Sequence, residues 1–117
     1  MEPIFEQDNF ISKAACKRLI SYQKNNCPKN MPKGYWNNRI VSSYDKSIKN
    51  LINSIHHKVL SLVQKFYNED VLYLEFSNLV YWGKGMELVP HADNFWIDNP
   101  KKPHNYSHRV YSSILYL

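Results

Sequence analysis

The fold is decided by residues 45–82, which read DKSIKNLINSIHHKVLSLVQKFYNEDVLYLEFSNLVYW. In the first part of this stretch, apolar residues recur at spacings of three and four, which predicts one long amphipathic helix from Asp45 onward. The apolar positions are Ile48, Leu51, Ile52, Ile55, Val59, Leu62, Val63 and Phe66. The polar positions are Lys46, Lys49, Asn53, His57, Lys58, Ser61, Gln64 and Lys65. We therefore expect the helix to lie on a core with one side facing water.

The second part of the stretch has the composition of strands. Residues 71–82 are rich in β-branched, aromatic and leucine side chains, which predicts a strand buried on at least one face. A turn at residues 83–85 and a short strand at residues 86–90 are expected next. After a loop at residues 94–107, the final residues 108–117 predict another strand.

Upstream, residues 11–26 predict a first helix with Ser12 as its N-cap. The apolar face of this helix is expected to contain Ala15, Cys16, Leu19, Ile20 and Gln23. Residues 25–43 are rich in Pro, Gly and Asn and predict a long loop, in which residues 39–43 could form a short strand. Helices followed by strands indicate an α+β fold.

Composition limits the class of protein. The chain has 117 residues, 44% hydrophobic and 21% charged, which fits one small domain. The net charge of +5 is spread along the sequence, so no dense basic run suggests a nucleic-acid partner. No stretch approaches the roughly 20 apolar residues of a membrane span, and the first ten residues are acidic, so we expect a cytoplasmic protein without a membrane partner. Cys16 and Cys27 form neither a metal spacing nor a disulfide framework and are expected to be reduced.

The residues that could carry chemistry begin with His91 and Asp93. One residue separates them, so on an extended strand both side chains point to the same face and can reach one ion. An imidazole nitrogen and a carboxylate oxygen are two thirds of the facial triad that binds iron(II) in oxygenases. Alone, His-x-Asp is a weak signal that arises by chance in many proteins.

Two further blocks flank this pair and strengthen the signal. A tyrosine and a Gly-containing turn occupy residues 81–85 (YWGKG), ahead of His-x-Asp in residues 91–94 (HADN), and an arginine leads into a strand in residues 109–117 (RVYSSILYL). Together with residues 5–12 and the helix that follows them, these blocks resemble, in the same order, prolyl 4-hydroxylase-like members of the iron(II)- and 2-oxoglutarate-dependent oxygenases. The resemblance implies a single domain, 1–117, with helices in residues 1–68 and early strands of a double-stranded β-helix, or jelly roll, in residues 69–117.

The resemblance also implies roles for four residues beyond the metal pair. Tyr81 matches a tyrosine that lines the 2-oxoglutarate pocket, and Tyr116 matches one that reaches the distal carboxylate of that co-substrate. Ser112 stands where the family often has threonine, and Arg109 where an arginine commonly lies near the mouth of the active site. The alternative for the two tyrosines is ordinary packing in a protein with nine tyrosines. The alternative for the arginine is a solvated or ion-paired side chain.

The implied activity is that of a dioxygenase. His91 and Asp93 would ligate iron(II), and 2-oxoglutarate and O2 would be consumed while a peptide or a small molecule is hydroxylated. Ascorbate is a further candidate cofactor.

The family pattern is incomplete in these 117 residues. Its third ligand, a histidine on a later strand, and the arginine or lysine that pairs with the co-substrate have no match. His104 and His108 are the internal candidates for a substitute ligand, whereas His56 and His57 are expected on or beside the solvent face of the long helix. The resemblance therefore implies an N-terminal part that is inactive as this chain alone.

Two other functions stay open. The chain could be a non-catalytic interaction module that binds a partner, or a second copy of itself, along an exposed sheet edge. It could also be a small basic nucleic-acid binder, whose affinity would fall steeply with salt.

Overall fold

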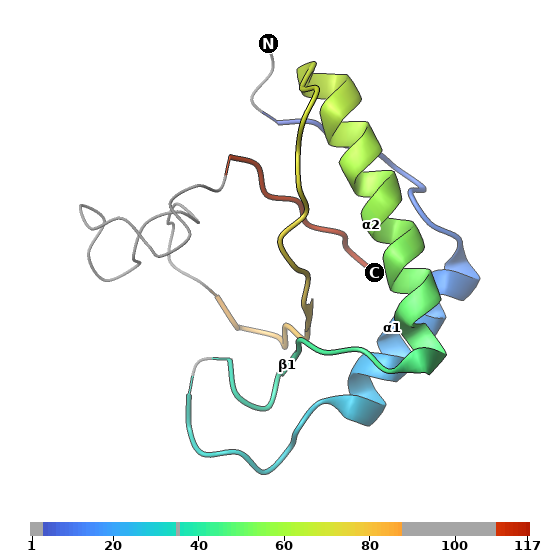
Figure 1. Cartoon of the computed structure of the whole chain (residues 1–117). Coiled ribbons are helices and arrows are strands. Elements are labelled where there is room, and N and C mark those ends of the chain that lie inside the picture. The colour runs from blue at the N-terminus through green and yellow to red at the C-terminus, as the bar shows by residue number, and fades with distance from the viewer. Residues whose placement is uncertain (1–3, 35, 88–109) are drawn as a thin grey trace, which may run out of the picture. The chain divides into compact units, whose positions relative to one another are not determined.

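The computed structural model describes residues 4–34, 36–87 and 110–117, and its regular elements follow the order α1, β1, α2, β2 (Figure 1). The chain divides into two compact units. One contains Met1–Tyr81 together with Leu117, and the other contains Trp82–Tyr116. The helices and strands of the described residues all belong to the first unit. The class is α+β, with two helices and a two-stranded antiparallel sheet, as the sequence predicts at this level.

Helix α1 spans Lys13–Asn26 and confirms the predicted cap. The Ser12 hydroxyl accepts a hydrogen bond from the Ala15 amide at 3.1 Å, which satisfies one of the free N–H groups of the first turn. Leu19, Tyr22 and Gln23 are buried, whereas Ile20 is 37% exposed. The expected position of Ile20 on the buried face is wrong, because Tyr22 lies beside Leu19 on the covered side and Ile20 lies about 100° away from Leu19 around the axis.

Helix α2 spans Lys46–Tyr67. Its N-cap is Asp45, the residue from which the sequence predicts the helix. The Asp45 side chain accepts a hydrogen bond from the Ser47 amide at 2.9 Å. At the other end, Asn68 adopts a left-handed conformation with φ of 55°, and its amide donates to the Gln64 carbonyl. The Glu69 amide donates to the same carbonyl at 2.9 Å. Asparagine suits this terminus because it tolerates the left-handed region better than most residues.

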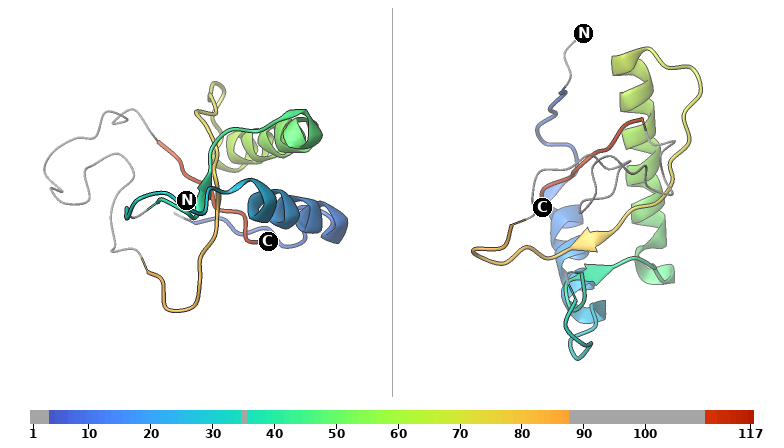
Figure 2. Two further views of the ribbon diagram at one scale, coloured as in Figure 1. Left: turned by 90° about the horizontal axis from the view of Figure 1, so that it is seen from below. Right: turned by 90° about the vertical axis from the view of Figure 1, so that its left-hand side faces the viewer.

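The core lies against the N-terminal half of α2. Ile48, Ile52 and Ile55 are buried there, while Val59 and Leu62 further along the helix are only half-buried. Figure 2 shows α1 and α2 side by side, so Leu19 of α1 can share this core. Burial of such side chains contributes about 1.5–3 kcal/mol each.

Polar contacts join the two helices near the start of α2. The Arg18 guanidinium donates to the Ser47 carbonyl at 3.0 Å, and the Asp45 amide donates to the Tyr22 hydroxyl at 3.0 Å.

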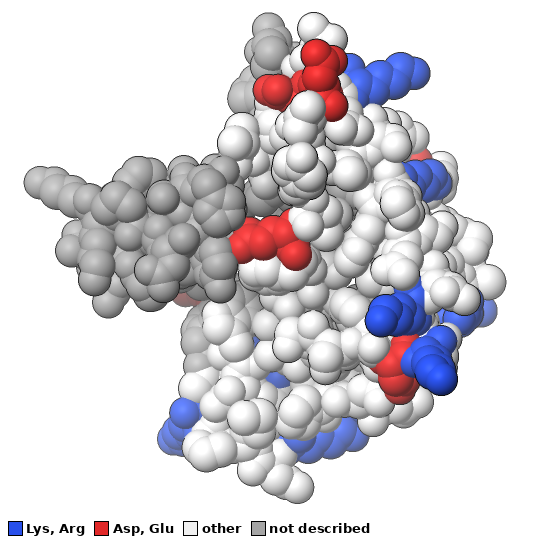
Figure 3. Space-filling model, in the orientation of Figure 1, with Lys and Arg blue, Asp and Glu red and all other residues white. Residues whose placement is uncertain are grey.

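The outer face of α2 is exposed to solvent, as its sequence pattern predicts. Figure 3 shows Lys and Arg side chains spaced along the helical side of the surface. Neither helix in the described part of the chain is both long and apolar enough to cross a membrane.

The sheet is much shorter than the sequence predicts. β1 (Ile40–Val41) pairs antiparallel with β2 (Leu79–Val80), with Ile40 opposite Val80 and Val41 opposite Leu79. The expected short strand within residues 39–43 is confirmed. The expected strands over residues 71–82 and 108–117 are wrong as stated, because only Leu79–Val80 forms a ladder and residues 110–117 form none. The short strand expected at residues 86–90 is absent from residues 86 and 87, and the rest of it lies outside the described residues.

Candidate functional site

Tyr81 follows β2 directly, and its amide shares a backbone acceptor with a side chain of α1. Its amide donates to the Arg39 carbonyl at 2.8 Å, which continues the pairing of β1 with β2 by one residue. The side-chain amide of Gln23 donates to the same carbonyl at 3.0 Å. Gln23 is buried, and a buried amide is stable only when it is hydrogen-bonded. The main chain of Tyr81 is thus fixed through α1, while its side chain is 55% exposed and available to a ligand.

The second unit opens with the predicted glycine turn. The Met86 amide donates to the Gly83 carbonyl at 3.1 Å, and the Gly83 amide lies 2.6 Å from the Met86 sulfur. Gly85 occupies the third position of this turn with φ of +82°. Glycine adopts that conformation more readily than residues with a side chain, so the sequence Gly83-Lys84-Gly85 fits its turn.

The other residues implied by the resemblance divide into two groups. His91, Asp93 and Arg109 lie outside the described residues, as do His104 and His108. Tyr116 and Ser112 belong to the second unit, where both are exposed, Tyr116 by 86%.

A hydrogen-bonded cluster that the sequence did not indicate joins α2 to the segment before β2. The Ser77 hydroxyl lies 2.7 Å from Nε2 of His56 and 3.1 Å from the Tyr44 hydroxyl. Tyr44 also donates to the Ser77 carbonyl at 3.0 Å, and its ring lies 6.3 Å from the ring of Tyr22. We refer to Tyr44, His56 and Ser77 as the Ser77 cluster. One signal could have pointed to it, because His56 lies four residues after the buried Ile52 and shares its side of the helix.

Burial changes the acid–base behaviour of the Ser77 cluster. It lowers the pKa of His56 below the ordinary 6.5, and the neighbouring charge of His57 lowers that pKa further. It raises the pKa of Tyr44 above 10.0, against the opposing effect of the hydrogen bond from Ser77. Both groups are therefore neutral near pH 7, and they serve as hydrogen-bonding partners that fix the chain ahead of β2.

Within the part of the chain that the structure describes, no three His, Cys, Asp or Glu side chains gather closely enough to hold an ion. Two surface grooves of the described residues are lined by residues other than Tyr44, His56 and Ser77.

Comparison with known proteins adds no relative. No family model matches the chain, and searches of curated proteins and of solved structures gave no match either.

Proposed function

We propose that this chain is the N-terminal part of an iron(II)- and 2-oxoglutarate-dependent oxygenase of the prolyl 4-hydroxylase-like type, in which the helices pack on a jelly-roll sheet. The observation that carries the proposal is the setting of Tyr81. Tyr81 follows the last residue of β2, its backbone amide is hydrogen-bonded, and its phenol is exposed. A glycine turn comes directly after it in the sequence. A tyrosine followed by a Gly-containing turn is what the resemblance implies ahead of the metal pair.

The donor chemistry fits the implied metal in part. His91 and Asp93 offer one nitrogen and one oxygen two residues apart, the pair expected for iron(II) with open positions for a co-substrate. When bound, iron(II) and 2-oxoglutarate supply the oxidising chemistry that hydroxylates a C–H bond. The chain contributes positioning, because a phenol such as Tyr81 can donate a hydrogen bond to a carboxylate while its ring excludes water from one side.

Metal binding by the chain is the first test. Iron(II) is titrated anaerobically into the wild type and into His91→Ala and Asp93→Ala, with His57→Ala on α2 as the matched control. We expect weak binding that disappears in both site variants and persists in the control, since two ligands hold a metal less firmly than three. Equal binding by all four proteins would contradict the assignment of the ligands.

Co-substrate binding is the second test, performed on the gene product with any residues encoded after Leu117. Adding 2-oxoglutarate to the anaerobic iron(II) complex should produce a weak visible charge-transfer band. Tyr81→Phe should raise the 2-oxoglutarate concentration for half-saturation by about twofold to tenfold, the value of one lost hydrogen bond. A stoichiometric iron(II) complex that gives no band would refute the oxygenase proposal.

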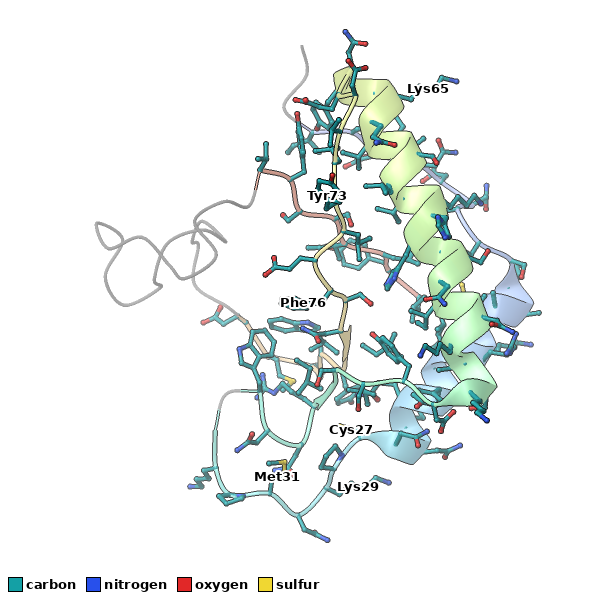
Figure 4. All side chains as sticks on the ribbon, viewed as in Figure 1. Cys27, Lys29, Met31, Lys65, Tyr73 and Phe76 are labelled. Carbon is teal, nitrogen blue, oxygen red and sulfur yellow. The ribbon has the colours of Figure 1, made fainter. Side chains whose placement is uncertain are left out.

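A second candidate function is a protein-interaction module. It is favoured by Val71 and Tyr73, which are 67% and 89% exposed on the extended segment between α2 and β2, where Figure 4 labels Tyr73. Leu72 and Leu74 alternate with them and are half-buried, so the segment has one covered and one open apolar face. An open, extended apolar segment can accept a strand from a partner. If Tyr73→Lys abolishes self-association while the iron(II) titration shows no dependence on His91, this second function is preferred.

A further inference from the structure

A groove within the first unit runs between the N-terminal segment and the outer face of α2. It measures about 670 Å³, which is in the range of small-ligand sites, although it is open to solvent along one side. Asn9 and Phe10 line it from the N-terminal segment, and Asn9 has a left-handed backbone with φ of 53°. Residues of α2 form the opposite wall.

The α2 wall is a continuous row of hydrogen-bond donors and cations. His57, Ser61 and Lys65 follow each other at intervals of four residues, so they lie on one stripe of the helix. All three are exposed, and Lys65 projects outward from the C-terminal end of α2 (Figure 4). No carboxylate lines this groove in the described part of the chain.

Lys58 is held in place beside this row. Its ammonium group donates to the Phe10 carbonyl and lies 4.5 Å from the centre of the Phe10 ring. The hydrogen bond uses one of the three N–H donors of Lys58, and the Phe10 ring covers one side of its ammonium group. The cation is therefore already positioned, and a ligand does not have to order a flexible lysine before binding to it.

We infer that this groove binds a phosphate group. Its cations are Lys58 and Lys65, the Ser61 hydroxyl is a further donor beside them, and no arginine lines it in the described part of the chain. Lysine binds phosphate as a point charge, without the planar, two-pronged geometry that arginine brings. A tetrahedral dianion can take donors from Lys58, Ser61 and Lys65 on different sides. The phosphate can be free or carried on an organic molecule, and the inference is independent of the oxygenase proposal.

The test follows backbone amide shifts of the full chain by NMR at constant ionic strength. Inorganic phosphate, O-phosphoserine and succinate are titrated separately. We expect saturable shifts at His57, Ser61 and Lys65 with one or both phosphates and much weaker ones with succinate. Tighter binding of O-phosphoserine indicates a phosphomonoester ligand, and tighter binding of inorganic phosphate indicates free phosphate.

Variants decide whether the groove or general positive charge is responsible. Lys65→Gln should weaken phosphate binding by about two- to fivefold, as expected for an exposed charge contact, and His57→Gln should weaken it through the altered hydrogen-bonding group. The matched controls are Lys46→Gln and Lys49→Gln, which remove the same charge from α2 outside the groove and should leave the affinity unchanged. All four side chains are exposed, so folding should be unaffected. Equal losses in the controls, equal binding of succinate, or no saturation would overturn the inference.

Discussion

Replacing Ser77 by alanine should destabilise the first unit by about 1–2 kcal/mol. The hydroxyl has two side-chain partners, His56 at 2.7 Å and Tyr44 at 3.1 Å, and each such hydrogen bond contributes about 0.5–1.5 kcal/mol net. All three side chains are half-buried, so water can replace part of what is lost, which keeps the total below the sum of two full contributions. Tyr44 keeps its bond to the Ser77 carbonyl, because that acceptor belongs to the backbone.

The assay is urea unfolding followed by far-UV circular dichroism, with Ser77→Ala, Tyr44→Phe and the double variant forming a cycle. Tyr44→Phe removes the phenol that contacts both the carbonyl and the hydroxyl of Ser77, so its loss of unfolding free energy should equal or exceed that of Ser77→Ala. Because the two groups touch, the cycle should give a coupling of about 0.5–1.5 kcal/mol.

Ser43→Ala is the matched control for this cycle. Ser43 lies outside the helices, directly before Tyr44, and is exposed, so its replacement should change the unfolding free energy by less than about 0.5 kcal/mol. If Ser77→Ala behaves like this control, or if the coupling with Tyr44→Phe is zero, the Ser77 cluster does not hold the segment before β2 and the reasoning fails.

Two further predictions concern the same unit. Ile52 is 5% exposed, so Ile52→Ala should cost about 2–5 kcal/mol and Ile52→Val about 0.5–1.5 kcal/mol in the same urea assay, and similar values for both would contradict its place in the core. Burial, reinforced by the charge of His57, lowers the pKa of His56 in the folded chain. The free energy of unfolding should therefore be highest above pH 6.5 and should fall as the pH drops below that value, because the unfolded chain binds the proton first. His56→Gln should flatten this part of a stability–pH profile while His57→Gln keeps most of it, and an unchanged profile in His56→Gln would show that another group is responsible.

The helices could be predicted from the sequence because their signals are local. Spacings of three and four gave α2, and Ser12 and Asp45 marked the two starting points that the structure confirms. A helix satisfies its backbone hydrogen bonds within itself, so its pattern needs no knowledge of partners. The error at Ile20 arose because the predicted face was centred on Cys16, Leu19 and Ile20, whereas the buried face also includes Tyr22, on the other side of Leu19.

The strands could not be predicted to the same extent, because a strand depends on a neighbour that its own sequence does not specify. The exposure of residues 71–74 alternates along the chain, because Leu72 and Leu74 are half-buried while Val71 and Tyr73 are exposed. Pairing begins only at Leu79, where β1 lies opposite. Local composition therefore predicted a strand over the whole segment, whereas pairing with a partner distant in the sequence limits the strand to Leu79–Val80.

For the candidate site, the sequence predicted which residues could act but not what holds them. The glycine turn after Tyr81 could be read directly from Gly83 and Gly85. The Ser77 cluster could not, because its three members come from a loop, a helix and an extended segment. Its only sequence signal, a histidine beside a buried helical stripe, does not identify the partner.

The Arg39 carbonyl shows why the helices matter for the proposed site. It accepts from Gln23 of α1 and from the amide of Tyr81, so its two lone pairs serve one packing contact and one strand contact at once. An apolar residue at position 23 would leave this carbonyl with one donor and would remove the link between α1 and the end of β2. Gln23, assigned from its sequence only to a helix face, is therefore part of what positions the tyrosine on which the oxygenase proposal rests.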